Sequence, residues 1–110
     1  MKINKVFLCG KLMRDPNIGL TEASKQVANL EILTDESYVN STTGETVNKA
    51  ERHRIVAWGK QAEKCKVFKK DDLVYVEGKN QTRRTDEGLV GEIVAHDVQL
   101  VTLDVQSVTQ

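Results

Sequence analysis

The sequence contains the stretch Lys49-Ala50-Glu51-Arg52-His53-Arg54-Ile55-Val56-Ala57-Trp58-Gly59-Lys60, whose pattern predicts one long strand with two unlike faces. Successive side chains on a strand point to opposite faces, so Arg52, Arg54 and Trp58 share one face and Ile55 lies on the other. Cations that alternate with an aromatic ring suit single-stranded nucleic acid, because cations pair with phosphates and flat rings stack on bases. The alternative is a structural strand whose indole lies in a core or a subunit interface, and this pattern alone leaves both interpretations open.

The same stretch resembles the central motif of the bacterial single-stranded DNA-binding protein family. That motif usually reads Glu-Trp-His-Arg-Val-Val, then an aromatic residue, Gly-Lys and an Ala-Glu pair, which corresponds here to Ala62-Glu63. Four further pieces match the family in order: Asn4-Lys5-Val6-Phe7-Leu8 with Gly10, Asp15-Pro16, Val27-Ala28-Asn29, and Val74-Tyr75-Val76-Glu77-Gly78 with Thr82-Arg83. Each piece alone is weak, but together they cover about residues 1 to 103 with matching order and spacing.

Length and composition predict a single globular domain. The chain has 110 residues, of which 39% are hydrophobic and 29% charged, so it can form one modest core and does not have the composition of a disordered chain. Its apolar runs are much shorter than the roughly 18 residues that a membrane span needs. The start, Met1 to Lys5, is charged too early for a signal peptide. We therefore expect a cytoplasmic, nucleoid-associated protein without a membrane partner.

The charges are unevenly distributed although the formal net charge is zero. Between Lys49 and Lys70 there are eight Lys or Arg residues and two acidic ones, whereas residues 85–110 contain five acidic residues and no Lys or Arg. One part of the chain can therefore present a positive surface, which permits nucleic-acid binding without requiring it.

The order of predicted elements indicates an all-β fold. Strands are expected over residues 3–13, 26–38, 49–59, 73–84 and 89–103, with a turn at Asp15-Pro16-Asn17 and a bend at Gly10. Residues 60–70 predict a short helix between the third and fourth strands, with an apolar stripe of Ala62, Cys65 and Phe68. This order matches the five-stranded Greek-key barrel of the oligonucleotide/oligosaccharide-binding fold. A parallel βαβ sheet is disfavoured, because a single short helix cannot supply its crossovers.

The sequence departs from the family at two stacking positions. Arg52 stands where the family usually has Trp before the central His, and Thr85 corresponds to another family Trp, while Tyr38 and Trp58 keep an aromatic ring. Arg52 and Arg84 can compensate by pairing with phosphates or by stacking a guanidinium plane on a base. We expect binding that is weaker or more salt-sensitive than in a typical relative. The expected DNA-binding residues are Lys5, Tyr38, Lys49, Arg52, Arg54, Trp58, Lys60, Lys70, Arg83 and Arg84.

Catalytic, metal and cofactor sites are not expected. The sequence lacks a phosphate-binding glycine loop, H-E-x-x-H and G-x-S-x-G. Cys9, Cys65, His53 and His96 fall in four different elements without a close ligand pair, which disfavours a zinc site. The two cysteines are expected to be reduced, partly buried thiols, and His53 a hydrogen-bonded interior or interface residue.

The resemblance implies sequence-independent binding and protection of single-stranded DNA in replication, recombination or repair, by a homo-oligomer in which a tetramer is favoured over a dimer. Residues 1–104 are expected to form the binding domain and residues 105–110 a short polar tail. Because the chain ends without the family's acidic tip, recruitment of replication and repair proteins by that route is not expected. The alternative function is a structural adaptor of a replication complex with weak or no DNA binding of its own.

Overall fold

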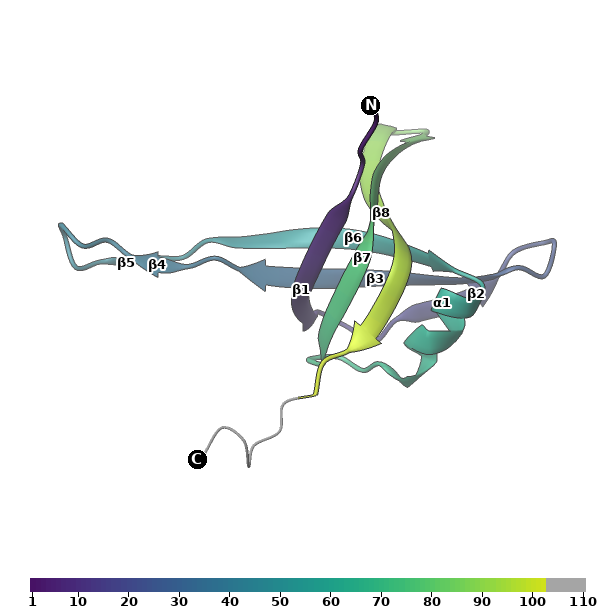
Figure 1. The fold of residues 1–110 in the computed structure, drawn as a ribbon, viewed down its shortest axis with the longest axis horizontal. Coiled ribbons are helices and arrows are strands. Elements are labelled where there is room, and N and C mark those ends of the chain that lie inside the picture. The colour runs from purple at the N-terminus through teal and green to yellow at the C-terminus, as the bar shows by residue number, and fades with distance from the viewer. Residues whose placement is uncertain (103–110) are drawn as a thin grey trace.

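The computed structural model describes residues 1–102 and contains a closed barrel of five strands (Figure 1). The barrel strands are β1 (Val6–Leu12), β3 (Gln26–Asp35), β6 (Ala50–Trp58), β7 (Leu73–Thr85) and β8 (Gly88–Leu100). They pair around the ring in the order β1, β7, β8, β6 and β3, and β3 pairs again with β1. All pairings are antiparallel except that of β6 with β8. The predicted all-β, five-stranded Greek-key barrel is therefore confirmed.

Three short strands add to the predicted set and change two predicted boundaries. β2 (Asn17–Leu20) pairs along the first half of β3, so Asn17 lies in a strand rather than in the predicted turn. That edge of β3 is open because β1 pairs only with its second half, at Ile32 and Leu33. The predicted second strand ends at residue 35 rather than at residue 38, because the Asp35 carboxylate accepts a hydrogen bond from the Ser37 N–H at 2.9 Å and turns the chain. The chain then forms two further short strands, β4 (Tyr38–Val39) and β5 (Thr46–Val47), which pair with each other.

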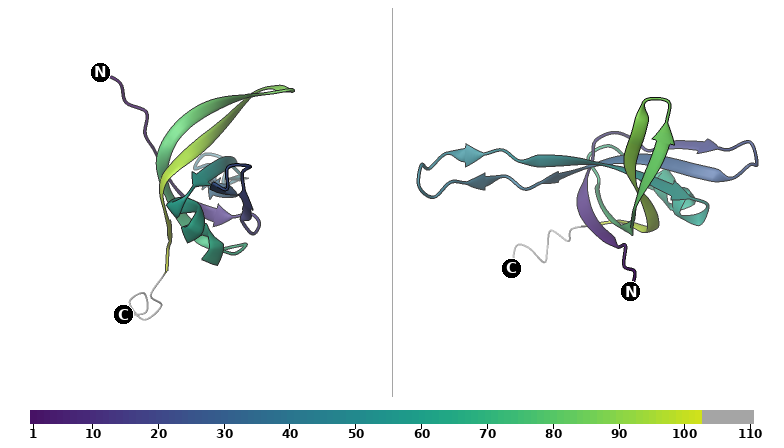
Figure 2. Two further views of the ribbon diagram at one scale, coloured as in Figure 1. Left: turned by 90° about the vertical axis from the view of Figure 1, so that its right-hand side faces the viewer. Right: turned by 90° about the horizontal axis from the view of Figure 1, so that it is seen from above.

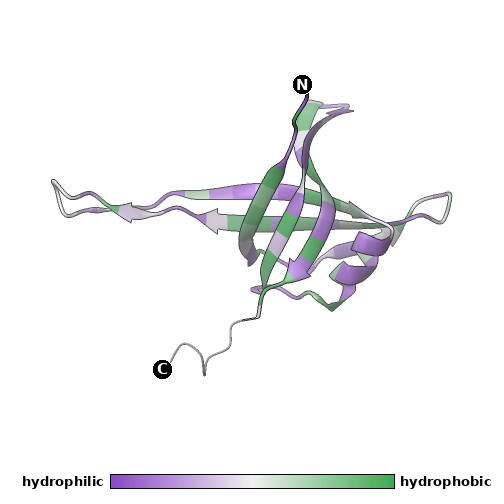
Figure 3. Ribbon diagram, viewed as in Figure 1, coloured by the Kyte–Doolittle hydropathy of each residue, from purple (hydrophilic) through white to green (hydrophobic). Residues whose placement is uncertain are grey.

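The core is formed by alternate residues of the barrel strands. Ala28, Leu30 and Ile32 of β3 are buried as the alternation predicts, and Ile55 faces them from β6. Each large aliphatic side chain in such a core stabilises the fold by about 1.5 to 3 kcal/mol. Figure 3 shows hydrophobic positions distributed along the barrel strands and a mostly hydrophilic helix. Trp58 is not among the buried residues, so the core interpretation of its indole is wrong.

Gly10 lies where β1 changes its pairing partner. Residues 6–11 of β1 pair with β7. Lys11 pairs with β3 on its other side, as does Leu12, so the strand bends across the barrel at this point. A Cβ at Gly10 would lie 2.5 Å from the backbone oxygen of Leu33. Only glycine permits this close backbone approach, which is the barrel bend that the sequence predicts at Gly10.

The helix is shorter than predicted. α1 (Lys60–Lys64) is followed by a 3₁₀ turn, η1 (Cys65–Val67), instead of continuing to residue 70. The Phe68 N–H donates to the Cys65 carbonyl at 3.1 Å, which tightens the last turn, and Phe68 itself has extended backbone angles. The predicted apolar stripe is nevertheless correct, because Ala62, Cys65 and Phe68 are all buried in the core.

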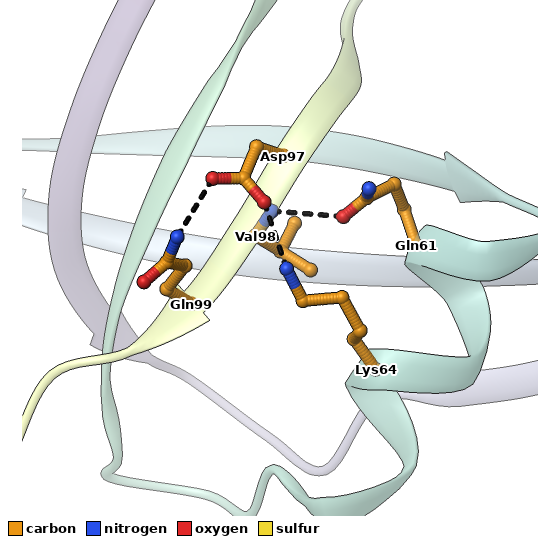
Figure 4. A network of polar contacts seen from close by, with 5 residues as sticks. All are labelled: Gln61, Lys64, Asp97, Val98 and Gln99. Atoms are coloured by element: carbon orange, nitrogen blue, oxygen red, sulfur yellow. Dashed lines mark hydrogen bonds and ion pairs between the residues drawn. The ribbon is translucent and has the colours of Figure 1, made fainter.

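Polar contacts attach α1 to β8 (Figure 4). The parallel ladder between β6 and β8 spans only two residue pairs, so the later part of β8 needs other partners on this side. The Gln61 side-chain oxygen accepts a hydrogen bond from the Val98 N–H at 3.1 Å, and Lys64 Nζ lies 2.7 Å from Asp97 Oδ1. Gln99 Nε2 donates to Asp97 Oδ2 at 2.9 Å. The hydrogen bond from Lys64, with that from Gln99, lowers the pKa of Asp97 from its ordinary value.

Two long hairpins project from the barrel (Figure 2). One is the outer part of β7 and β8, beyond an irregularity between Glu77 and Gly78, and the other continues β3 and β6 into the β4–β5 arm. A Cβ at Gly78 would lie 2.1 Å from the Val94 carbonyl oxygen, so the two strands cross closely where the first hairpin leaves the barrel. The predicted tail, residues 105–110, lies outside the described residues. In residues 1–102, α1 is far too short to reach across a bilayer and no other helix is longer.

Candidate nucleic-acid interface

A groove of about 470 Å³ runs along β3 and β6 beside the β7–β8 hairpin. Its lining combines four arginines and three carboxylates with small polar and apolar residues: Arg14, Asp15, Asn17, Asn29, Leu30, Glu31, Arg52, Arg54, Ile55, Arg83 and Glu92. A smaller hollow of about 140 Å³ adjoins it and shares Arg52, Arg54 and Glu92. Arginines at this density suit a ligand with several anionic oxygens, because each planar guanidinium can donate two parallel hydrogen bonds.

Strand register explains why these arginines face the groove. In the antiparallel β3–β6 pair, Glu31 lies opposite Arg54 and Leu33 lies opposite Arg52. Residues directly opposite each other point to the same face of the sheet, so Glu31, Arg52 and Arg54 share the outer face. Arg83 reaches the groove from β7, whose outer part curves past this face.

Most groove arginines pair with a groove carboxylate. The Glu31 carboxylate lies 2.7 Å from Arg14 and 3.7 Å from Arg52, and Glu92 lies 3.4 Å from Arg83. Arg54 has no ion pair among the described residues. The side chains of the three paired arginines, Arg14, Arg52 and Arg83, are more than half exposed, so water and ligands can reach them. Because the guanidinium groups are exposed, their charges remain available for binding although the partner carboxylates are mostly covered.

Trp58 lies further along the same face of β6. It is the fourth residue after Arg54, a distance of about 13 Å along an extended strand. Its side chain is 37% exposed, and the Lys25 ammonium lies 5.0 Å from its ring centroid. The exposed indole can stack on a base, while Lys25 adds a positive charge beside it.

The other predicted site residues lie outside the groove. Lys5 pairs with Glu77 at 2.6 Å on the outward side of β1 and β7, and the hydrogen bond to Glu77 raises the pKa of Lys5. Tyr38, which is 55% exposed, and Lys49 lie in the arm that carries β4 and β5. Lys60 begins α1, and Lys70 lies in the turn whose backbone contacts Asp15. Arg84 follows Arg83 on the β7–β8 hairpin.

Sequence reasoning missed several groove or stacking residues, among them Arg14, Glu31, Glu92 and Lys25. Glu31 is in phase with Asn29 on β3, opposite the inward set, so alternation alone could have placed it on the outer face. Arg14 and Lys25 come from turns, whose position relative to the sheet no periodicity predicts.

The cysteines and histidines stay apart from this site. Cys65 is a buried free thiol, and burial raises its pKa to about 11, which makes it unreactive. Cys9 is also free but exposed, so the expectation of partial burial is wrong for it, because it lies on the outward face of β1. His53 Nε2 lies 2.9 Å from Thr34 Oγ1, as expected for a hydrogen-bonded histidine. Across residues 1–102, no three His, Cys, Asp or Glu side chains are grouped as metal ligands.

Solved structures with the same fold include single-stranded DNA-binding proteins. The wild-type single-stranded DNA-binding protein of Thermus aquaticus matches 91% of this chain and 50% of its own chain, with a TM-score of 0.79 and 22% identity. A Plasmodium falciparum single-stranded DNA-binding protein in complex with single-stranded DNA matches 94% of this chain and 97% of its own, with a TM-score of 0.78 and 27% identity.

Sequence similarity extends over nearly the whole chain. The single-stranded DNA-binding protein 1 of Chlorobaculum tepidum is 40% identical over 106 residues, which cover 90% of this chain and 65% of that protein. The chain thus spans about two thirds of the length of this curated relative and half of the Thermus chain. The family model described as the single-strand binding protein family matches residues 3–104. The chain belongs to the single-strand binding protein family.

Proposed function

We propose that this protein binds single-stranded DNA without sequence preference and protects it during replication, recombination or repair. The observation that carries the proposal is one face of β6 that presents Arg52 and Arg54 to a groove and an exposed Trp58 beyond it. Charge for phosphates and a ring for unstacked bases are the two features that sequence-tolerant binding of a single strand needs. Membership of the family and the DNA-bound Plasmodium relative of the same fold support it. The proposed role is binding rather than catalysis.

The adaptor alternative is less well supported. A structural adaptor does not need aromatic rings on a cationic face, yet Trp58 and Tyr38 are both exposed. An exposed indole on the same strand face as two arginines has a clear use in stacking and none in a barrel that serves only as a spacer.

Titration with poly-dT separates the two functions. Trp58 is the only tryptophan in the sequence, so its fluorescence reports directly on the proposed stacking position. Binding of DNA predicts quenching together with a mobility shift, whereas absence of both would favour the adaptor. The same titration with poly-U at two salt concentrations measures the preference for DNA over RNA.

Exchange of Arg52 tests how the groove holds the strand. Log affinity falls against log salt with a slope of about −0.7 for each phosphate contacted on a single strand. Arg52→Ala is expected to reduce this slope by somewhat less than about one unit, as the loss of one phosphate contact requires. Arg52→Trp is expected to flatten the slope too but to hold or raise affinity at high salt, because stacking is screened less than charge. If both variants keep the slope and affinity of the unchanged protein, Arg52 does not contact the strand.

We propose further that residues 1–104 act as the binding domain, that the protein works in the cytoplasm, and that it assembles into a homo-oligomer, a tetramer in preference to a dimer. One barrel offers few stacking positions, so several copies extend the surface available to one strand. The outward face of β1 is a suitable contact surface, because Phe7 is 59% exposed there with Tyr75 nearby on β7.

Light scattering at micromolar concentration tests this assembly. The chain mass is 12.3 kDa, so a tetramer is expected at about four times that value. Phe7→Glu is expected to lower the mass by placing a charge in the apolar contact, while circular dichroism stays unchanged. A mass of one chain for the unchanged protein would contradict the proposed assembly.

A further inference from the structure

The carboxylate of Glu31 lies among guanidinium groups in the groove. Its side chain is only 15% exposed, and it contacts Arg14 at 2.7 Å and Arg52 at 3.7 Å. Arg54 lies directly across the β3–β6 pair from it. An acidic side chain in the middle of an arginine cluster neutralises guanidinium groups and fills the position that an anionic ligand would otherwise take.

The groove as a whole is largely neutralised by its own residues. Four arginines face three carboxylates, which leaves a formal charge of only +1. Two of the carboxylates have neutral hydrogen-bond partners, because Asp15 accepts a hydrogen bond from the Lys70 N–H and Glu92 accepts one from Gln81. Glu31 alone bridges two arginines, so its removal changes the charge of the cluster most.

On the basis of the proposed function, we propose that Glu31 is an internal counter-anion that a bound strand displaces. In the free protein it neutralises Arg14 and Arg52, and a phosphate of the strand then takes its place on these guanidinium groups. Carboxylate and phosphate oxygens accept the same forked hydrogen bonds from arginine, so the exchange is chemically conservative. Arg52 is released first, because its 3.7 Å contact is looser than the 2.7 Å contact of Arg14.

This exchange has a measurable effect on salt dependence. Binding of a phosphate by a free arginine releases a counterion from the nucleic acid. When the arginine must first leave Glu31, the freed carboxylate takes up a cation from solution, which cancels part of that release. The unchanged protein should therefore bind more weakly, and with a shallower salt slope, than a variant with a neutral residue at position 31.

Glu31→Gln tests the exchange because it keeps the shape of the side chain and its ability to accept a hydrogen bond. Its affinity for poly-dT at low salt is expected to rise about three- to tenfold, the effect of one unit charge about 4 Å away in an open groove where water screens the pair. Its salt slope is expected to steepen by a part of the about 0.7 that one phosphate contact contributes. Glu31→Thr makes the same charge change with a β-branched side chain that suits a strand, in case the amide variant folds poorly.

Glu63→Gln is the matched control. It removes the same charge from a carboxylate on α1 that pairs with Lys66 of η1 at 2.8 Å and does not line the groove. Its affinity should stay close to that of the unchanged protein. An equal gain in both glutamine variants would mean that only net charge matters, and would overturn the inference.

A double-mutant cycle with Arg52→Ala gives the decisive measurement. If Glu31 neutralises Arg52, the loss of Arg52 should cost more affinity in the Glu31→Gln background than in the unchanged protein. Additive effects, or an unchanged or weaker affinity in Glu31→Gln, would overturn the inference while leaving the proposed function intact. Failure of the unchanged protein to bind poly-dT would overturn both.

Discussion

Replacing Trp58 with Ala is expected to weaken binding to poly-dT by about 5- to 150-fold, since one stacked base contributes about 1 to 3 kcal/mol. The indole is 37% exposed on the face that carries the groove arginines, so a base can reach it. Fluorescence anisotropy of a labelled oligonucleotide measures the change, because the variant has no tryptophan of its own.

Trp58→Phe is the control for this experiment. It keeps an aromatic ring opposite Val27 in the β3–β6 register and should recover most of the lost affinity. Both variants must show the circular dichroism spectrum of the unchanged protein. Unchanged affinity in a folded Trp58→Ala variant would show that the indole has a structural role only.

Replacing Gly78 with Ala is expected to destabilise the barrel by about 3 kcal/mol or more, at or above the upper end of typical overpacking effects. The added methyl would lie 2.1 Å from the Val94 carbonyl oxygen and 2.9 Å from its carbon, and backbone atoms cannot move aside as a flexible side chain can. β7 and β8 would have to separate where the hairpin leaves the barrel. Urea denaturation should show the loss as a lower midpoint at unchanged slope.

Gly91→Ala is the matched control, because Gly91 lies in the same strand pair, opposite Thr82, and a Cβ there would meet no atom within 4 Å. Its stability should change little or rise by about 0.4 to 1 kcal/mol, because alanine restricts the unfolded chain. Equal stability of the two alanine variants would contradict the close crossing at Gly78.

The fold was predictable wherever a residue pattern reports on a local structure. Alternation identified the inward residues of β3 and β6, and Gly10 identified the bend where β1 changes partner. Helix length was overestimated, because the stripe of Ala62, Cys65 and Phe68 continues into a 3₁₀ turn and an extended residue that bury the same side chains. β2 was missed, since a four-residue edge strand depends on an open partner edge rather than on its own pattern.

The candidate site was only partly predictable. Arg52, Arg54 and the exposed face of Trp58 follow from alternation along one strand. The groove is a product of tertiary structure, because Arg14 comes from a turn and Arg83 from a hairpin that curves over β6. The same alternation cannot report that Lys5 is held by Glu77 on another side of the barrel.

The two-pair parallel ladder between β6 and β8 links binding to the completion of folding. Each groove wall belongs to a hairpin made from neighbouring segments, β3 with β6 and β7 with β8, and such local structures form early. The walls face each other only after β6 and β8 have paired, for example Ile55 with Ile93, which lie far apart in the chain. A partly folded chain therefore carries the arginines without the groove. A strand that binds only the closed ring raises its stability by mass action, so the nucleic acid acts as a folding ligand for its own binding site.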